Sequence, residues 1–299
     1  MNMPTERNPE IVQSAAPEVT AVGSRGPGPR EMTAFIALPF LIWIVGWTPG
    51  LIWASVVSAV AVLALLEFLI LGEKKHYVFQ KALCVLLLVF ILVTFVTNEI
   101  SVEVGVFAVL LLIPGSYVFA DSDLEIALPA SAVAVLSVLY IGMLAGALIR
   151  LRLDFEPFGS RLIFFLLITV WTSDAGAYYV GRKFGRRKLI PRVSPKKTVE
   201  GGMGGVATSM VSASIIHFTF FPEFPLIHAM AAALLLSFAG IVGDLTESAW
   251  KRSAAVKDSG GMLPGHGGFL DRIDSILFTA PVLYAYWFLL DERFALVTR

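Results

Sequence analysis

The feature that most constrains this chain is a series of long apolar runs separated by short polar stretches. The sequence is 57% hydrophobic and only 15% charged, whereas about 25% of the residues in a soluble domain are charged. Inside a bilayer every backbone polar group must find its partner within the segment, so continuous apolar runs of about 20 residues predict transmembrane helices. We therefore expect an all-α, polytopic integral membrane protein.

Nine candidate spans follow from these runs, each near the ~20 residues that cross a bilayer. The Thr48-Pro49-Gly50 sequence predicts a turn between the first two spans, which together are too long for one crossing. Pro114 and Gly115 predict a kink in the fourth span. The approximate bounds are 33–49, 51–71, 82–97, 103–120, 126–149, 162–181, 205–221, 226–243 and 273–290.

The placement of basic residues predicts the orientation. Lysine and arginine gather in the N-terminal tail and in the connections at 72–81, 182–204 and 244–272. All of these lie on one side if the helices alternate, so the positive-inside rule places the N-terminus in the cytoplasm and the C-terminus outside. The Arg150–Arg161 segment is a local exception, partly balanced by Asp154 and Glu156.

The chain divides into three parts. Residues 1–31 are rich in Pro, Glu, Ser and Gly and lack hydrophobic periodicity, which predicts a disordered tail without the features of a signal peptide. Residues 32–160 are N-terminal transmembrane helices, and residues 161–299 form a C-terminal transmembrane region with most of the polar chemistry. The net charge of zero gives no electrostatic argument for nucleic acid. The single cysteine, Cys84, lies in an apolar run and indicates packing.

The first polar segment begins at Asp174, a carboxylate near the end of the sixth span. Burying it there is costly unless a cation pairs with it. Basic residues follow, and the sequence from Ser194 through Lys196 and Lys197 to Thr198 combines hydroxyls and lysines suited to phosphate. The alternative is a positive-inside anchor on anionic lipid. The glycines at 201–205 would then allow close approach of a ligand or act as a hinge.

The second polar segment, 243–275, gives the stronger signal. If the eighth span continues as a helix, Asp244, Ser248 and Lys251 share one face at i, i+4 and i+7. Asp271 and Asp274 fall at the start of the last span, where a helix N-terminus favours carboxylates. Clustered Asp oxygens without Cys or several His suit Mg²⁺. The segment also contains basic residues that suit the phosphates of a nucleotide: Lys251, Arg252, Lys257 and Arg272. The alternative is that the segment is only a solvated charged loop.

This pattern resembles the signature of the phosphatidate cytidylyltransferase family. The residues that carry the resemblance lie between 248 and 274, and Asp174, Asp244 and the segment 194–198 are also similar to that family. The N-terminal spans are similar only in being hydrophobic. The signature residues are Ser248, Lys251, Arg252, Lys257, Asp258, Pro264, His266, Asp271, Arg272 and Asp274.

The resemblance implies about nine transmembrane helices, a homodimer, and a polar funnel open to the cytoplasm and the membrane. It implies Mg²⁺-dependent transfer of CMP from CTP to phosphatidic acid in a bacterial inner membrane, with residues 161–299 as the catalytic region. Asp244 and Asp271 become the metal ligands, with Asp274 in support and Lys251 among the catalytic residues. The substrate-binding set is Lys196, Lys197, Ser194, Thr198, Ser248, Arg252, Lys257, Asp258, His266, Arg272 and Asp174.

Two other functions are possible. A CTP-dependent lipid kinase would share the basic funnel and Mg²⁺ but would move the γ-phosphate, and the match from Lys251 to Asp274 argues against it. A transporter would need ionisable residues near mid-membrane. The spans are nearly free of them, and the exceptions Glu67 and Glu103 lie near predicted span ends.

Overall fold

The computed structural model describes residues 29–97, 99–120, 123–260 and 268–297. The predicted tail lies almost wholly outside this part, since the first helix begins at Pro29. Nine helices occur in the described residues, and each predicted span overlaps one of them. They are α1 (Pro29–Trp47), α2 (Gly50–Glu73), α3 (Lys81–Val96), α4 (Val102–Val118), α5 (Leu124–Leu153), α6 (Gly159–Phe184), α7 (Val199–Thr219), α8 (Leu226–Ser253) and α9 (Leu270–Val297).

Five described helices are long and apolar enough to cross a membrane: α2, α5, α6, α8 and the Leu270–Leu290 part of α9. Three shorter apolar helices accompany them, Leu38–Trp47, α3 and α4. Large apolar side chains such as Leu111 and Phe218 are exposed, as expected of surfaces that face lipid. The all-helical membrane architecture predicted from the sequence is confirmed, whereas nine crossings and a polar funnel stay predictions.

The predicted turn after the first span is confirmed, whereas the predicted kink in the fourth span stays a prediction. The backbone oxygen of Pro49 accepts hydrogen bonds from Ile52 and Trp53 at the start of α2, so the turn at Thr48–Gly50 separates two helices as predicted. Pro114 lies inside α4, which continues to Val118.

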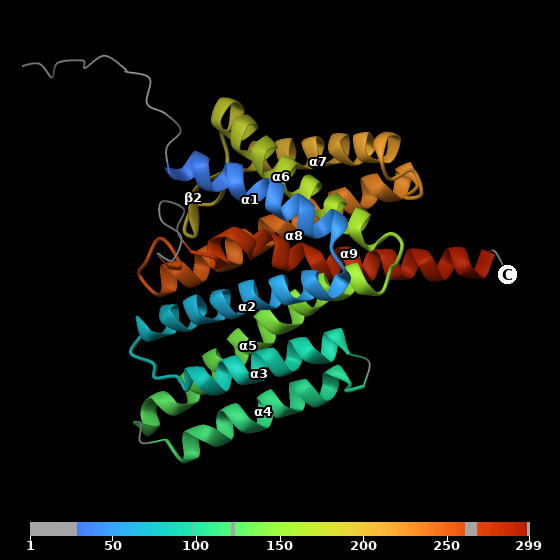
Figure 1. Ribbon diagram of the computed structural model, residues 1–299. Coiled ribbons are helices and arrows are strands. Elements are labelled where there is room, and N and C mark those ends of the chain that lie inside the picture. The colour runs from blue at the N-terminus through green and yellow to red at the C-terminus, as the bar shows by residue number, and fades with distance from the viewer. Residues whose placement is uncertain (1–28, 98, 121–122, 261–267, 298–299) are drawn as a thin grey trace, which may run out of the picture.

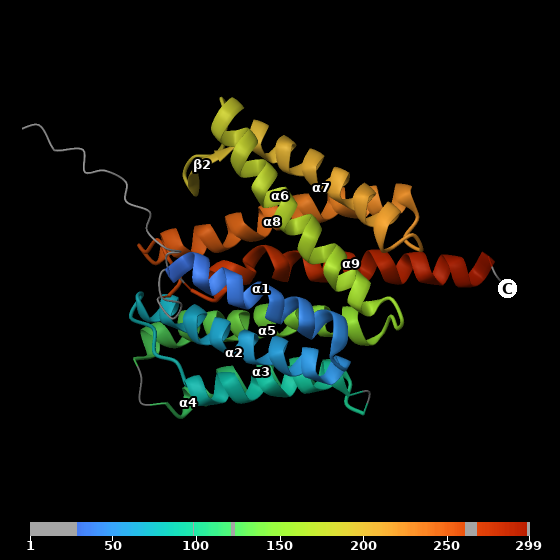
Figure 2. The same ribbon diagram turned by 45° about the horizontal axis from the view of Figure 1, so that its top comes forward.

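Neighbouring helices run in opposite directions, which gathers alternate connections at opposite ends of the molecule (Figures 1 and 2). The α2–α3, α6–α7 and α8–α9 connections lie at one end, on the left of Figure 1. The α1–α2, α5–α6 and α7–α8 connections lie at the other end. The connections that the sequence predicted on one side therefore do lie together.

The arginines of the predicted exception are neutralised locally. Arg150 pairs with Asp154 at 3.0 Å and Arg152 with Glu156 at 2.7 Å, both at the C-terminal end of α5. Arg161 pairs with Glu223 at 2.7 Å. These ion pairs explain how basic residues reach the side opposite the main cluster.

The helices form two groups joined through α5 and α9. The first group, α2 to α5, packs through α5, and the second, α6 to α8, packs through α6 and α7 (Figure 1). α9 contacts both α8 and α5. Its N-terminal end therefore lies where the two groups meet, with α8 on one side and α2 on the other.

The α6–α7 connection contains a short hairpin that the sequence did not predict. Strand β1 (Lys188–Ile190) pairs antiparallel with β2 (Ser194–Thr198), with Lys188 opposite Thr198 and an irregular register. Residues 201–205, expected as a flexible glycine segment, instead lie inside α7. A Cβ at Gly204 would lie 2.5 Å from Val180, so glycine here lets α7 pack closely against α6. The placement of these glycines in a loop was wrong, whereas their role in close approach of a ligand or as a hinge stays a prediction.

Candidate active site at one end of the helices

Most of the predicted site residues come from four elements that meet at the end with the basic connections, and the others lie between α8 and α9. α8 continues to Ser253, which carries Asp244, Ser248 and Lys251 on the helix as predicted. α9 begins at Leu270, so Asp271 lies in its first turn. β2 and α6 supply the remaining polar side chains.

Lys251 and Asp271 form an ion pair that links the end of α8 to the start of α9. Both side chains are largely buried. Lys251 Nζ also lies 3.5 Å from Oε1 of Glu247, one turn earlier on α8. A buried ion pair of this kind is costly to break, because the remaining partner stays charged and uncompensated.

The second oxygen of Asp271 is held by protein donors. Its Oδ2 accepts hydrogen bonds from the backbone N–H of Ser259 at 3.0 Å, the Ser259 hydroxyl at 2.9 Å and the backbone N–H of Gly268 at 3.0 Å. Together with Lys251, these donors fix the orientation of the carboxylate. The first turn of α9 therefore presents Asp271 in one defined position.

A second lysine–carboxylate pair lies beside the first. Lys197 of β2 pairs with Oδ2 of Asp244, and the Ser248 hydroxyl donates to Oδ1 of Asp244 at 3.2 Å. Asp174 on α6 is close enough to Asp244, Asp274 and Lys197 for electrostatic interaction with each. The Lys197 and Asp244 side chains are 27% and 34% exposed. The Lys197–Asp244 pair is therefore more accessible than the Lys251–Asp271 pair.

Two further carboxylates lie beneath these pairs. Asp274 is buried, and its Oδ1 accepts from the Ser275 N–H at 2.6 Å. Glu247 has no exposed surface, and its carboxyl lies against that of Asp274 and 3.5 Å from Lys251 Nζ. Two buried carboxyl groups side by side are unfavourable unless they share a proton or a cation. The site thus holds more acidic groups than the two lysines can neutralise.

Several predicted binding residues have other contacts or lie on the surface. Thr198 is buried and caps α7 by accepting from the Gly201 N–H at 3.2 Å. Arg252 donates to the backbone oxygen of Val256 at 3.1 Å. His266 lies outside the described residues. Ser194 is partly exposed on β2, and the remaining members are exposed: Lys196, Lys257, Asp258 and Arg272.

Three residues at the site were not predicted from the sequence. Glu247 precedes Ser248 within the singled-out segment but was assigned no role. Ser259 was passed over, although it follows Lys257 and Asp258 directly. Glu67, treated as a span-end residue, lies beside Ser259. The spacing of Glu247, four residues before Lys251, was a usable signal for the first of these.

The donor chemistry fits Mg²⁺, because the cluster offers carboxylate oxygens. Among the described residues, no three His, Cys, Asp or Glu side chains come together as ligands for one ion. Mg²⁺ usually takes one or two protein carboxylates and completes its shell with water and substrate phosphates. The residues therefore suit a metal that arrives with a phosphate ligand better than a closed protein cage.

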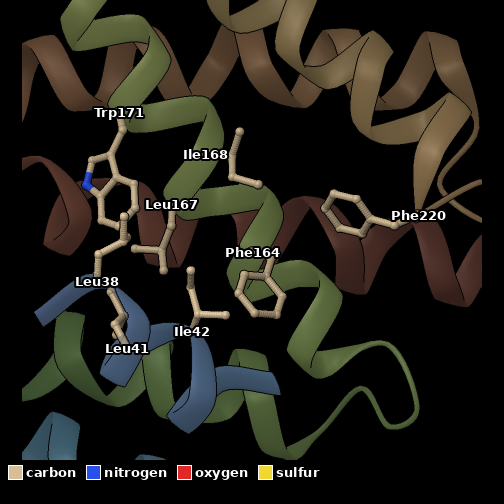
Figure 3. A pocket seen from close by; sticks show the side chains of 8 residues that line it. All are labelled: Leu38, Leu41, Ile42, Phe164, Leu167, Ile168, Trp171 and Phe220. Atoms are coloured by element: carbon tan, nitrogen blue, oxygen red, sulfur yellow. The ribbon is translucent and has the colours of Figure 1, made fainter. Parts of the chain in front are cut away.

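An apolar groove of about 420 Å³ lies between α1 and α6 (Figure 3). On α6, Phe164, Ile168 and Trp171 recur at helical spacing, and Asp174 follows three residues after Trp171 on the same face. The α6 wall of the groove therefore leads toward the charged cluster. The groove residues are Leu38, Leu41, Ile42, Phe164, Leu167, Ile168, Trp171 and Phe220.

The fold and the site define a helical integral membrane protein with lysine-paired carboxylates at one end. The model of the cytidylyltransferase family matches residues 29–290. The chain is 38% identical to the phosphatidate cytidylyltransferase of Bacillus subtilis over 258 residues, which cover 84% of this chain and 93% of that protein. This chain therefore belongs to the cytidylyltransferase family.

Other relatives match over about half of the chain. The phosphatidate cytidylyltransferase of Haemophilus influenzae is 45% identical over 161 residues, 50% of this chain and 55% of that protein. That of Pseudomonas aeruginosa is 45% identical over 130 residues, 43% and 48% of the two chains. The chain thus spans about half the length of these two relatives.

Proposed function

We propose that this protein is a phosphatidate cytidylyltransferase, which transfers CMP from CTP to phosphatidic acid and gives CDP-diacylglycerol and pyrophosphate. Membership of the cytidylyltransferase family and the 38% identity to the Bacillus subtilis enzyme support the activity. The site supports the choice of reactants, because both are phosphate anions and one carries apolar chains.

One observation carries the proposal. Two lysine–carboxylate pairs, Lys197–Asp244 and Lys251–Asp271, lie on adjoining elements at the same end of the molecule. The apolar wall of α6 ends at Trp171, and Asp174, which interacts with Asp244 and Lys197, follows three residues later. An amphiphile with a phosphate head can place its chain along α6 and its head beside Lys197. An acceptor without apolar chains would not bind in the groove.

The chemistry requires no covalent enzyme intermediate. A phosphate oxygen of phosphatidic acid attacks the α-phosphorus of CTP, and the bond from that phosphorus to the bridging oxygen breaks. The electron pair of the broken bond leaves with pyrophosphate. Positioning and electrostatic stabilisation supply most of the catalysis in such transfers.

The lysines act as cations that can change partners. In the structure they neutralise Asp244 and Asp271, and in the reaction Lys197 and Lys251 hold the phosphates and the developing charge on pyrophosphate. Asp244 and Asp271 would be the carboxylates that hold Mg²⁺, with Asp274 and Asp174 nearby. Bound Mg²⁺ would supply further stabilisation of the charge on the leaving group.

We further propose a bacterial inner-membrane location, with the active site facing the cytoplasm. The clustering of basic connections at the site end supports this orientation through the positive-inside rule (Figure 1). The homodimer implied by the family resemblance stays a proposal. Mass measurement of the detergent-solubilised protein would test it.

The direct test uses purified protein in detergent with phosphatidic acid, Mg²⁺ and CTP labelled on the α-phosphate. Label in the extracted lipid that depends on both phosphatidic acid and Mg²⁺ is the expected result. Label confined to the aqueous phase, with protein that remains folded, would refute phosphatidic acid as the acceptor. Lipid label from γ-labelled CTP and a polyprenol would identify a kinase instead.

A further inference from the structure

Glu67 is a buried carboxylate on α2, far from the site in sequence but adjacent to it in the fold. Its side chain lies within a membrane-spanning helix, and the residue has no exposed surface. A carboxylate in such surroundings is expensive unless donors reach it. The donors that do reach it belong to the catalytic end of the chain.

The Glu67 carboxylate contacts the start of α9 directly. Its Oε2 accepts from the backbone N–H of Leu270 at 2.9 Å, and Leu270 is the first residue of that helix. The first N–H groups of a helix have no partner within it, and the helix dipole favours a negative charge there. Glu67 therefore caps α9 one residue before Asp271.

Ser259 connects the same carboxylate to Asp271. The Ser259 hydroxyl lies 2.9 Å from Asp271 Oδ2 and 3.3 Å from Glu67 Oε2. It carries a single hydrogen, and its backbone N–H also donates to Asp271, at 3.0 Å. The position of Ser259 between the two carboxylates thus depends on both.

The backbone on either side of residues 261–267 packs on the Glu67 side chain. A Cβ added at Gly260 would lie 2.6 Å from Glu67 Oε1 and 2.8 Å from its carboxyl carbon. Gly268, whose N–H donates to Asp271 at 3.0 Å, also has the Glu67 carboxylate as a near neighbour. Only glycine allows this approach, so both described ends of the segment rest on Glu67.

We propose that Glu67 is a positioning residue of the active site. By capping α9 and supporting Ser259 and Gly268, it holds the Asp271 carboxylate in place opposite Lys251. That this affects catalysis rests on the proposed function of Asp271. That Glu67 positions Asp271 rests only on the contacts between α2, residues 259–260 and α9.

A purely stabilising role fits the surroundings poorly. Glu67 Oε1 is buried and accepts no hydrogen bond from a described donor. Glu67→Leu keeps a similar side-chain volume but removes the acceptor for Leu270 and Ser259, so some loss of stability is expected from the unsatisfied Leu270 N–H. A melting curve establishes that this variant is folded before its rate is measured. Glu67→Gln keeps one acceptor oxygen in a side chain of the same shape.

The experiment compares these two variants with Glu73→Leu, which changes an exposed glutamate on the same helix. We expect Glu67→Leu to lower kcat at least ~30-fold with KM for CTP within ~3-fold, because misplacing Asp271 affects the transition state. Glu67→Gln should recover most of this loss, and Glu73→Leu should stay within ~2-fold of wild type. A kcat for folded Glu67→Leu within ~2-fold of wild type would overturn the proposal.

A double-mutant cycle with Ser259→Ala tests the route through Ser259. Two residues that act on Asp271 through the same contacts should show a combined loss smaller than the product of the single losses. Losses that multiply would contradict that route.

Amide hydrogen exchange at Leu270 and Asp271 separates this inference from the proposed function. Faster exchange in Glu67→Leu but not in Glu73→Leu supports positioning even if the wild type fails to transfer CMP. Unchanged exchange would overturn the positioning role even if the wild type is an active cytidylyltransferase.

Discussion

Lys251 in the last turn of α8 forms an ion pair with Asp271 in the first turn of α9, and the two side chains are 11% and 12% exposed. The pair joins two helix ends that a 16-residue connection separates in sequence, 254–269. It closes one side of the candidate site. A substitution that removes the charge of either residue therefore alters both the charge balance of the site and the contact between the ends of α8 and α9.

Replacing Asp271 with Asn should abolish turnover while the protein stays folded. The amide keeps the shape but loses the charge that pairs with Lys251 and, in our proposal, binds Mg²⁺. We expect kcat/KM to fall at least ~100-fold, as in other sites built on electrostatic stabilisation. Initial rates with α-labelled CTP and a melting curve check this result. Near-normal activity would disprove the metal-ligand role, and Glu125→Gln at the exposed start of α5 provides the control.

The adjacent lysines of β2 should differ in their effect. Lys197 pairs with Asp244, whereas Lys196 is exposed. We expect Lys197→Ala to lower kcat/KM for CTP by ~30-fold or more and Lys196→Ala by less than ~5-fold, since the interactions of a solvent-exposed charge are weakened by water and salt. The sequence alone placed both lysines in the binding set. Equal losses would mean that substrate binding rearranges the hairpin.

Filling the groove should affect the lipid substrate and spare the nucleotide. Ile168→Trp adds a large side chain to the α6 wall shown in Figure 3. We expect KM for long-chain phosphatidic acid to rise ~10-fold, while a short-chain analogue and CTP change by less than ~3-fold. Val211→Trp, on an exposed part of α7, is the matched control. An equal rise for long and short chains would argue against chain binding in the groove.

Acid should loosen the hairpin that carries Lys197. The Arg186 backbone N–H donates to Glu200 Oε2 at 2.9 Å, and this bond, with those from the Glu200 and Arg187 amides, holds the Glu200 pKa below its usual range. The charged form is favoured by folding, so its contribution is present above the ordinary glutamate pKa of about 4.3 and is lost as pH falls through the lowered value.

Amide exchange at Arg186 and Arg187, corrected for intrinsic rates, measures this effect. We expect protection at neutral pH that declines in the acidic range. Glu200→Gln should weaken the protection at neutral pH and remove its dependence on pH. Protection in the wild type that is constant from neutral pH to below the glutamate pKa would contradict the assignment.

The sequence predicted helix positions well because a membrane allows few alternatives. Apolar length alone placed each span on one helix, and the turn at Pro49 was placed correctly. It did not predict the β1–β2 hairpin or the close packing of Gly204 against Val180. Both depend on contacts between segments, which hydrophobic periodicity does not encode.

The site was predictable where residues lie on one helix. Asp244, Ser248 and Lys251 share a face of α8 because helical spacing dictates it. The signature also identified Asp271 and its neighbours by residue type. It gave no partner for any of them, and it did not distinguish Lys197 from Lys196.

By itself, the sequence determined an all-helical membrane protein, its family and the kinds of residue at its site. Those properties follow from apolar length and local spacing, which act within one segment. The tertiary structure alone decided that Lys251 pairs with Asp271 and that Glu67 on α2 supports the start of α9. Such contacts join residues up to 203 positions apart. Such contacts form only when helix packing buries the charged groups near one another. Without water around them, these groups are stabilised by hydrogen bonds and ion pairs from the protein.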